Sequence, residues 1–203
     1  MYVQKRPPGY ALFFAPLRIL LDPIEYERVE FAYSQAKSGL DKKMRDDGTR
    51  SFDHPKAATW IYIYELDGRD SDTMVVILLH DIVEDALLLP SYRIKLNFGE
   101  EIAFDVTALT KLSEEKETIE EYLFRIIERG PRAILAKLCD LLHNLRTLSG
   151  CSEEKRVRKL DGYQNHYVRL LIPALREYGG QWAVYADALE PKIKEAIVMA
   201  IAA

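Results

Sequence analysis

Four ionisable side chains interrupt an otherwise apolar run between Val75 and Asp85, and their types are those that bind metal ions. Burying such groups is unfavourable unless they pair with one another or with a cation. His80 beside Asp81 offers two ligands to a divalent cation, and Glu84 and Asp85, one turn later, could hold or deprotonate a water on that cation. The run therefore predicts a metal site; the alternative is a satisfied core histidine followed by solvated acids.

A buried helix is expected to present these side chains together. At about 100° per residue the four polar residues fall on one arc of roughly 140°, while aliphatic residues cover most of the remaining circumference. The acidic loop at residues 67–72 supplies caps for the start of this helix, and Pro90 suits its end. We expect one continuous helix whose polar arc faces a shared cavity.

Two further segments offer partners for this site. His54 precedes Pro55, a residue suited to the first turn of a helix, so His54 is expected at or near a cap, from which it could project into a cavity. Alone, a histidine there is more often a surface or core residue than a ligand. The strongly apolar segment from Pro131 to Gly150 carries a polar seam within about 80° of a helical wheel. The seam consists of Lys137, Asp140, Asn144 and Thr147.

Helical periodicity dominates the chain, and the sequence has no convincing alternating segments of the kind typical of β-strands, so an all-α bundle is predicted. Residues 1–24, which hold four of the nine prolines, are expected to form an N-terminal extension. Residues 25–178 form the predicted main domain, and residues 179–203 a C-terminal helical tail packing on it. The basic run at residues 155–159 either faces solvent or closes over a substrate.

Composition narrows the possible partners. Lys and Arg number 28 against 32 Asp and Glu, a formal charge of −4, which argues against DNA or RNA and means that local cations must meet any anionic ligand. No apolar run approaches the ~20 residues of a membrane span, and no signal peptide is evident, so a cytoplasmic protein is expected. Cys139 and Cys151 lack metal-type spacing and are expected to be reduced, without a chemical role. The oligomeric state is not indicated.

Taken together, these residues resemble the HD superfamily of metal-dependent phosphohydrolases, in which a histidine, a His-Asp pair and a distant aspartate hold one metal. The surrounding sequence is more specific, because four successive segments resemble the hydrolase domain of RelA/SpoT homologues in order and spacing. The match covers roughly residues 25–175 and includes Leu78–Asp85, Phe98–Ala103, Leu109–Leu112 and Ala136–Leu148.

The resemblance implies an HD-domain helical bundle with a metal site between buried helices. It also implies Mn²⁺-dependent removal of the 3′-pyrophosphate from (p)ppGpp, a guanosine nucleotide alarmone, with another divalent transition metal possible. No room remains for synthetase or regulatory domains, so a small, hydrolase-only member is expected.

Roles carry over from the resemblance residue by residue. The implied metal ligands are His54, His80, Asp81 and Asp140. Glu84 and Asp85 would position and activate the attacking water. The implied substrate contacts are Arg45, Lys137, Asn144 and Thr147, of which the first two supply local cations for a pyrophosphate.

The segment before His54 departs from the family pattern. Gly48–Ser51 lacks the proline and aromatic ring usual there, and Asp46 stands where a basic residue is common. Because these positions lie near the family's base and phosphate pocket, another phosphorylated nucleotide is an alternative substrate: an adenosine alarmone, a nucleoside monophosphate or a nicotinamide dinucleotide phosphate. A binding module without turnover is a third hypothesis. The presence of both Glu84 and Asp85 argues against it, because a module that only binds has no need for water-activating carboxylates.

Overall fold

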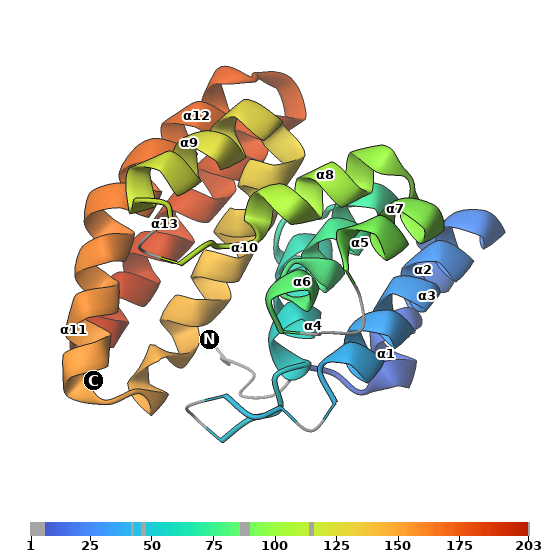
Figure 1. The fold of residues 1–203 in the computed structure, drawn as a ribbon, viewed down its shortest axis with the longest axis horizontal. Coiled ribbons are helices and arrows are strands. Elements are labelled where there is room, and N and C mark those ends of the chain that lie inside the picture. The colour runs from blue at the N-terminus through green and yellow to red at the C-terminus, as the bar shows by residue number, and fades with distance from the viewer. Residues whose placement is uncertain (1–6, 42, 46–47, 86–89, 114–115, 203) are drawn as a thin grey trace.

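The computed structural model describes residues 7–41, 43–45, 48–85, 90–113 and 116–202, which are mostly helical (Figure 1). Within these ranges β-pairing is limited to an isolated bridge between Met44 and Arg50. The predicted all-α class is confirmed. None of the helices in the described ranges is both long enough and apolar enough to cross a membrane.

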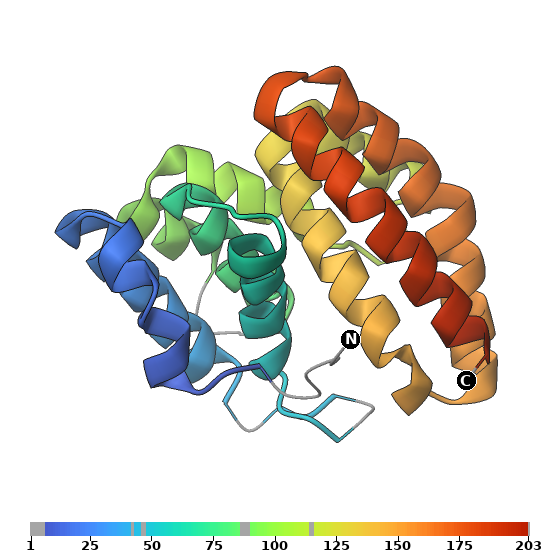
Figure 2. The ribbon, with the colours of Figure 1, turned by 180° about the vertical axis from the view of Figure 1, so that it is seen from behind.

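The helices gather into two groups, and α10, a member of the second group, lies at the border between them (Figures 1 and 2). Helix α10 packs on α4, α5 and α8 of the first group and on α9, α12 and α13 of the second. The first group comprises α1 (Tyr10–Phe14), α2 (Leu17–Leu20), α3 (Pro23–Gly39), α4 (Asp53–Trp60) with its π-helical continuation η1 (Ile61–Glu65), α5 (Ser71–Leu79), α6 (Ile82–Asp85), α7 (Ser91–Phe98) and α8 (Glu100–Leu109). The second group comprises α9 (Ile119–Arg129), α10 (Pro131–Thr147), the 3₁₀ turn η2 (Leu148–Gly150), α11 (Glu153–Gly162), the π-helical η3 (Tyr163–Val168), α12 (Arg169–Glu177) and α13 (Gly180–Ala202).

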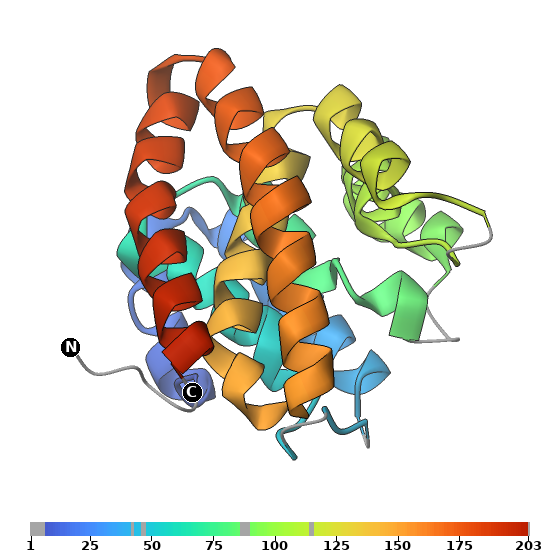
Figure 3. The same cartoon turned by 90° about the vertical axis from the view of Figure 1, so that its left-hand side faces the viewer.

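Helix α10 is central, and buried residues lie on nearly every side of it, including the polar Asp140. Its first turn contains Pro131, which suits a position where the backbone N–H has no helical partner, and Gly130 before it adopts a φ of 120°. Leu135, Leu138 and Leu142 are fully buried. The basic helix expected near residues 152–178 is the rod α11–η3–α12, which lies alongside α13 (Figure 3).

The described part of residues 1–24 packs into the core. Phe13 and Phe14 in α1 are 0% and 1% exposed. Phe13 places its ring 5.3 Å from that of Tyr33 in α3 and 5.9 Å from that of Trp60 in α4, measured between centroids. This burial joins the segment to the bundle, and the division of the chain into extension, domain and tail stays a prediction.

The single helix predicted through residues 75–85 is wrong, because α5 ends at Leu79 and α6 begins at Ile82. The imidazole of His80 provides the reason. Its Nδ1 lies 2.7 Å from the carbonyl oxygen of Ile77, a group that a continuous helix would offer to the N–H of residue 81. The break allows Asp81 to turn toward the same space as His80 instead of following it around a helix.

A close approach at Gly68 sets the angle between the segments that carry His54 and His80. The N–H of Gly68 donates to the carbonyl of Tyr62 at 2.9 Å, and the N–H of Asp70 donates to the Tyr62 hydroxyl at 3.1 Å. Asp70 then caps the start of α5 with its side chain. A Cβ atom at position 68 would lie 2.2 Å from the buried Tyr62 ring, so only glycine fits this turn.

We expect Gly68→Ala to lower the free energy of unfolding by about 1–3 kcal/mol, because the Tyr62 ring or the backbone must move. Gly162 provides a matched control: it lies in a helix, and a Cβ there meets no atom within 4 Å. Gly162→Ala should be neutral or stabilising, since alanine favours helix. Chemical denaturation of both variants measures the difference, and equal stabilities would contradict the steric argument.

Candidate metal centre

Three mutually packed helices bring the four predicted ligands together. His54 lies in the first turn of α4, His80 and Asp81 follow the last turn of α5, and Asp140 lies in the middle of α10. His54, His80 and Asp140 are 2–3% exposed, and the Asp81 side chain is 27% exposed. The site therefore has a buried floor and an opening beside Asp81.

The donor atoms of these residues converge. His54 Nε2 lies 2.8 Å from Asp140 Oδ1, 3.2 Å from His80 Nε2 and 3.6 Å from Asp81 Oδ2. His80 Nε2 lies 3.0 Å from Asp81 Oδ1 and 3.7 Å from Asp140 Oδ1. Ligand atoms about 2.1 Å from one ion and at right angles to each other are about 3 Å apart. Two imidazoles and two carboxylates at this spacing fit a divalent transition metal.

The cluster contains two ionised carboxylates, whose negative charge favours binding of a cation. Burial disfavours the charged form of His80, but Asp81 and Asp140 outweigh it and raise its pKa to about 10. Although burial acts in the opposite direction, the pKa of Asp81 lies below its ordinary value, chiefly because of His80, and that of Asp140 also lies below, because of Lys137 and both histidines. A proton therefore sits on His80 between two carboxylates, and a divalent ion would replace it.

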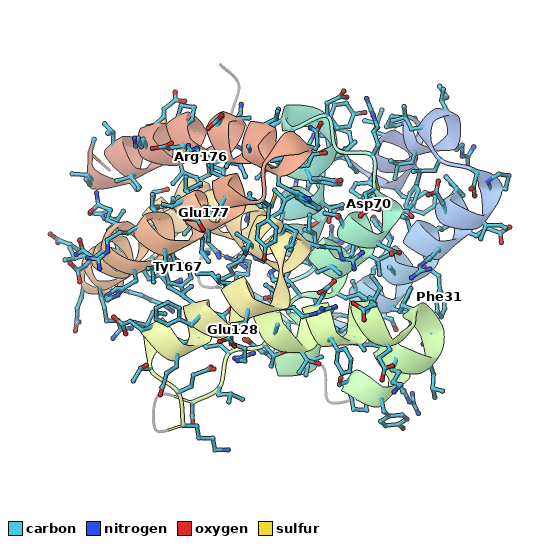
Figure 4. The ribbon with its side chains drawn as sticks, turned by 90° about the horizontal axis from the view of Figure 1, so that it is seen from above. Phe31, Asp70, Glu128, Tyr167, Arg176 and Glu177 are labelled. Atoms are coloured by element: carbon cyan, nitrogen blue, oxygen red, sulfur yellow. The ribbon has the colours of Figure 1, made fainter. Side chains whose placement is uncertain are left out.

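Lys137 is tied to the second oxygen of Asp140. Its Nζ lies 2.7 Å from Asp140 Oδ2, and it lies 5.4 Å and 5.6 Å from the ring centres of Tyr122 and Tyr167. Figure 4, which looks from above, labels Tyr167 on the α11–η3–α12 rod beside α10. Burial lowers the pKa of Lys137, but Asp140 and the two phenols outweigh it and hold the pKa well above its ordinary value. The ammonium thus adds a fixed positive charge behind the carboxylate.

Two of the predicted substrate contacts form a chain that ends on Asp140. Arg45 Nη2 donates to Asn144 Oδ1 at 2.7 Å, and Asn144 Nδ2 donates to Asp140 Oδ1 at 2.5 Å. Thr147 lies one turn further along α10, but its hydroxyl donates to the carbonyl of His143 at 3.1 Å. Arg45 and Asn144 are therefore brought to the metal centre, whereas the Thr147 proton is engaged by its own helix.

Glu84 lies on α6, close enough to Asp81 and Lys137 for their charges to influence its carboxylate. Its Oε1 accepts the backbone N–H of Lys111. Burial raises the pKa of Glu84 above its ordinary value, the Lys111 N–H lowers it, and the charge of Asp81 raises it further. The side chain of Asp85, its predicted partner in activating water, lies outside the described residues.

One residue at the centre, His143, was not among the predicted site residues. Its Nδ1 lies 2.7 Å from His54 Nδ1, and the two ring centres are 4.8 Å apart. A signal was present in the sequence, because a residue three positions after Asp140 lies about 60° from it on a helical wheel. The predicted seam, about 80° wide, does not include His143.

Comparisons with known proteins find related sequences and a related fold. The sequence profile described as the HD domain matches residues 32–170. Among curated relatives, a guanosine-3′,5′-bis(diphosphate) 3′-pyrophosphohydrolase of Aquifex aeolicus is 36% identical over 139 residues, which is 66% of this chain and 20% of that protein. A probable GTP pyrophosphokinase of Mycobacterium leprae is 34% identical over 141 residues, 64% of this chain and 17% of that protein. This chain thus spans about a fifth of the length of these relatives.

A solved structure shares the fold. It belongs to a study of a metazoan SpoT orthologue that hydrolyses ppGpp, and it superposes with a TM-score of 0.67 at 22% sequence identity. The match covers 85% of this chain and 94% of that one. The predicted resemblance to RelA/SpoT-type hydrolase domains is confirmed by these relatives together with the profile match.

Proposed function

Because this chain belongs to the HD-domain family, we propose that it is a Mn²⁺-dependent phosphohydrolase that removes the 3′-pyrophosphate of (p)ppGpp, giving GDP or GTP and pyrophosphate. The observation that carries the proposal is the convergence of His54, His80, Asp81 and Asp140 at ligand spacing. Relatives with 34–36% identity, one of them named as this hydrolase, support the choice of substrate. We also propose that the protein is cytoplasmic, and the free, buried thiol of Cys139 is consistent with the reducing conditions there.

The chain's own residues have distinct tasks in this reaction. Hydrolysis joins a water oxygen to the phosphorus next to the ribose and breaks the bond from that phosphorus to the 3′ oxygen, which takes up a proton. A divalent ion in the site would supply Lewis-acid polarisation of the phosphate and lower the pKa of the water. Glu84, with its raised pKa, would take the proton of the water, together with Asp85. Arg45 and Lys137 would oppose the negative charge of the pyrophosphate, and Asn144 would help to orient it by hydrogen bonding.

Arg45→Ala is expected to raise KM about tenfold or more and to leave kcat within a few fold. The reason is that the Arg45 guanidinium contacts Asn144 at the rim of the site and does not touch a predicted ligand. Steady-state kinetics on ppGpp measure both constants.

Arg50→Ala is the matched control for this arginine. Arg50 lies five residues later, and its guanidinium is engaged by Asp53 at 2.9 Å and 3.1 Å. The KM of the Arg50→Ala variant should change by less than the KM of the Arg45→Ala variant. An unchanged KM in Arg45→Ala would remove Arg45 from the substrate pocket, and a larger effect in Arg50→Ala would move the pocket toward the altered loop.

A second candidate function has one observation in its favour. The altered loop before His54 supplies Arg50 and Ser51 where the resembled family has a proline and an aromatic ring, and Arg50 is paired with Asp53. A base pocket of different shape would accept another nucleotide at the same metal centre. Asp46, the other departure, lies outside the described residues.

Product analysis separates these candidates. The purified protein with Mn²⁺ is offered ppGpp, pppGpp, pppApp and NADPH in parallel, with and without EDTA. EDTA-sensitive release of pyrophosphate from the guanosine alarmones is expected. Activity confined to another nucleotide would keep the metal centre and change the substrate. Inactivity on all four, with metal bound, would favour a binding module.

A further inference from the structure

The two histidines of the metal centre are held in different ways at their outer nitrogens. His80 Nδ1 faces the carbonyl oxygen of Ile77 at 2.7 Å. His54 Nδ1 faces Nδ1 of His143 at the same distance. In both rings the other nitrogen, Nε2, points toward Asp81 and Asp140. Both histidines thus direct the same atom, Nε2, toward the metal position, but the group that holds the other nitrogen differs: a backbone carbonyl for His80 and an imidazole for His54.

The support of His80 leaves no choice of tautomer. A carbonyl oxygen only accepts, so His80 must carry a proton on Nδ1 to make this contact. Its Nε2 can then lose its own proton and offer a lone pair to a metal ion. A backbone carbonyl in this position is a common support for a metal-binding histidine.

The support of His54 is an imidazole, which can donate or accept. A hydrogen bond between two Nδ1 atoms requires a proton on one ring and a lone pair on the other. If His143 donates, neutral His54 carries its proton on Nε2, where it points at Asp140 Oδ1 2.8 Å away and blocks a metal ion. If His143 accepts, His54 carries its proton on Nδ1 and Nε2 is available. Only the second arrangement makes His54 a ligand.

We propose that His143 is a positioning residue that accepts the Nδ1–H of His54 and so keeps His54 Nε2 available for the metal ion. The inference rests on the proposed metal centre and adds a residue to it. His143 does not touch the metal position itself, because its Nδ1 faces the outer nitrogen of His54. It lies on α10 three residues after Asp140, so one helix supplies both a ligand and the support of another ligand.

The test compares two substitutions at the same position. His143→Leu keeps much of the volume and removes the acceptor. His143→Asn restores one, because the Oδ1 of asparagine can occupy the place of the histidine Nδ1. His166→Leu is the control, since His166 is engaged by Glu120 on the outside of the bundle, at 2.8 Å. Free Mn²⁺ is measured during titration by its electron paramagnetic resonance signal, which does not depend on substrate.

His143→Leu should weaken Mn²⁺ binding about 10- to 100-fold, the usual effect of losing a support for a metal-binding histidine. His143→Asn should recover most of this affinity, and His166→Leu should match the parent protein. If His143 has only a structural role, both His143 variants should lose thermal stability, and His143→Asn should not bind Mn²⁺ more tightly than His143→Leu. Equal Mn²⁺ affinity in the parent and in folded His143→Leu, or no recovery in folded His143→Asn, would overturn the proposal.

Imidazole NMR gives a second readout that follows the tautomer directly. Long-range ¹H–¹⁵N spectra of the protein loaded with diamagnetic Zn²⁺ should show a protonated Nδ1 on His54 in the parent. A His54 proton on Nε2 would contradict the assignment. If the parent protein bound neither Mn²⁺ nor Zn²⁺, the proposed function itself would fail, and the titration distinguishes that outcome from failure of the His143 role.

Discussion

Replacing Asp81 by alanine is expected to abolish bound metal and turnover together. Asp81 is the carboxylate that closes the site, with one oxygen 3.0 Å from His80 Nε2 and the other 3.6 Å from His54 Nε2. Its low pKa keeps it ionised near neutral pH, so the substitution removes both a proposed ligand and a negative charge. We expect kcat to fall at least about a thousandfold, equivalent to roughly 4 kcal/mol of transition-state stabilisation. Metal content after gel filtration and the rate of pyrophosphate release measure the two losses.

Asp53→Asn is the control for this substitution. Asp53 precedes the proposed ligand His54 in sequence, but its carboxylate faces Arg50 and Lys56, each at 2.9 Å. Burial raises its pKa, and these two cations outweigh burial and lower it, so Asp53 is also ionised. Its loss should reduce stability while the protein still binds one metal ion. Stoichiometric metal with a normal rate in Asp81→Ala would show that Asp81 is not a ligand.

Residue types alone predict a metal site at His80 and Asp81, whereas the complete set of four ligands was implied by the family resemblance. His80 and Asp81 follow the segment from Met74 to Leu79, which is almost wholly buried. Because burying ionisable groups is costly unless they pair or bind a cation, a metal site explains their presence better than chance does. Asp140 stood out as part of the polar seam of α10, and its role as a ligand was implied by the resemblance. The distances among them could not be predicted, since they depend on how α4, α5 and α10 pack.

Predictions failed where a side chain competes with the backbone or reaches across the fold. The continuous helix was wrong because His80 bonds to the carbonyl of Ile77, a contact invisible to hydrophobic periodicity. His143 was missed because its contact with His54 joins residues that are 89 positions apart in sequence. The extension predicted for residues 1–24 stays a prediction, and the burial of Phe13 in it depends on rings from α3 and α4, which proline content does not reveal.

Glu84→Gln is expected to keep the metal and to lower kcat about 10²- to 10⁴-fold, the usual contribution of a general base. Glutamine preserves an oxygen that can accept the Lys111 N–H, as Glu84 does, but it takes up no proton near neutral pH. The Lys111 contact holds the carboxylate in place, while desolvation and the charge of Asp81 raise its pKa above the ordinary value, the direction that makes a carboxylate a stronger base. Metal content and single-turnover rates measure the two parts of the prediction.

Glu84→Ala separates positioning from proton transfer. It removes both the base and the contact with Lys111, so α6 loses its link to the segment after α8. If Glu84 acts as the base, alanine and glutamine should slow the reaction to a similar extent, with the metal retained in both. If Glu84 only anchors α6, glutamine should be nearly as fast as the parent and alanine alone slow. A normal rate in both variants would assign proton transfer elsewhere, and Asp85, the adjacent carboxylate, would then be the residue to replace.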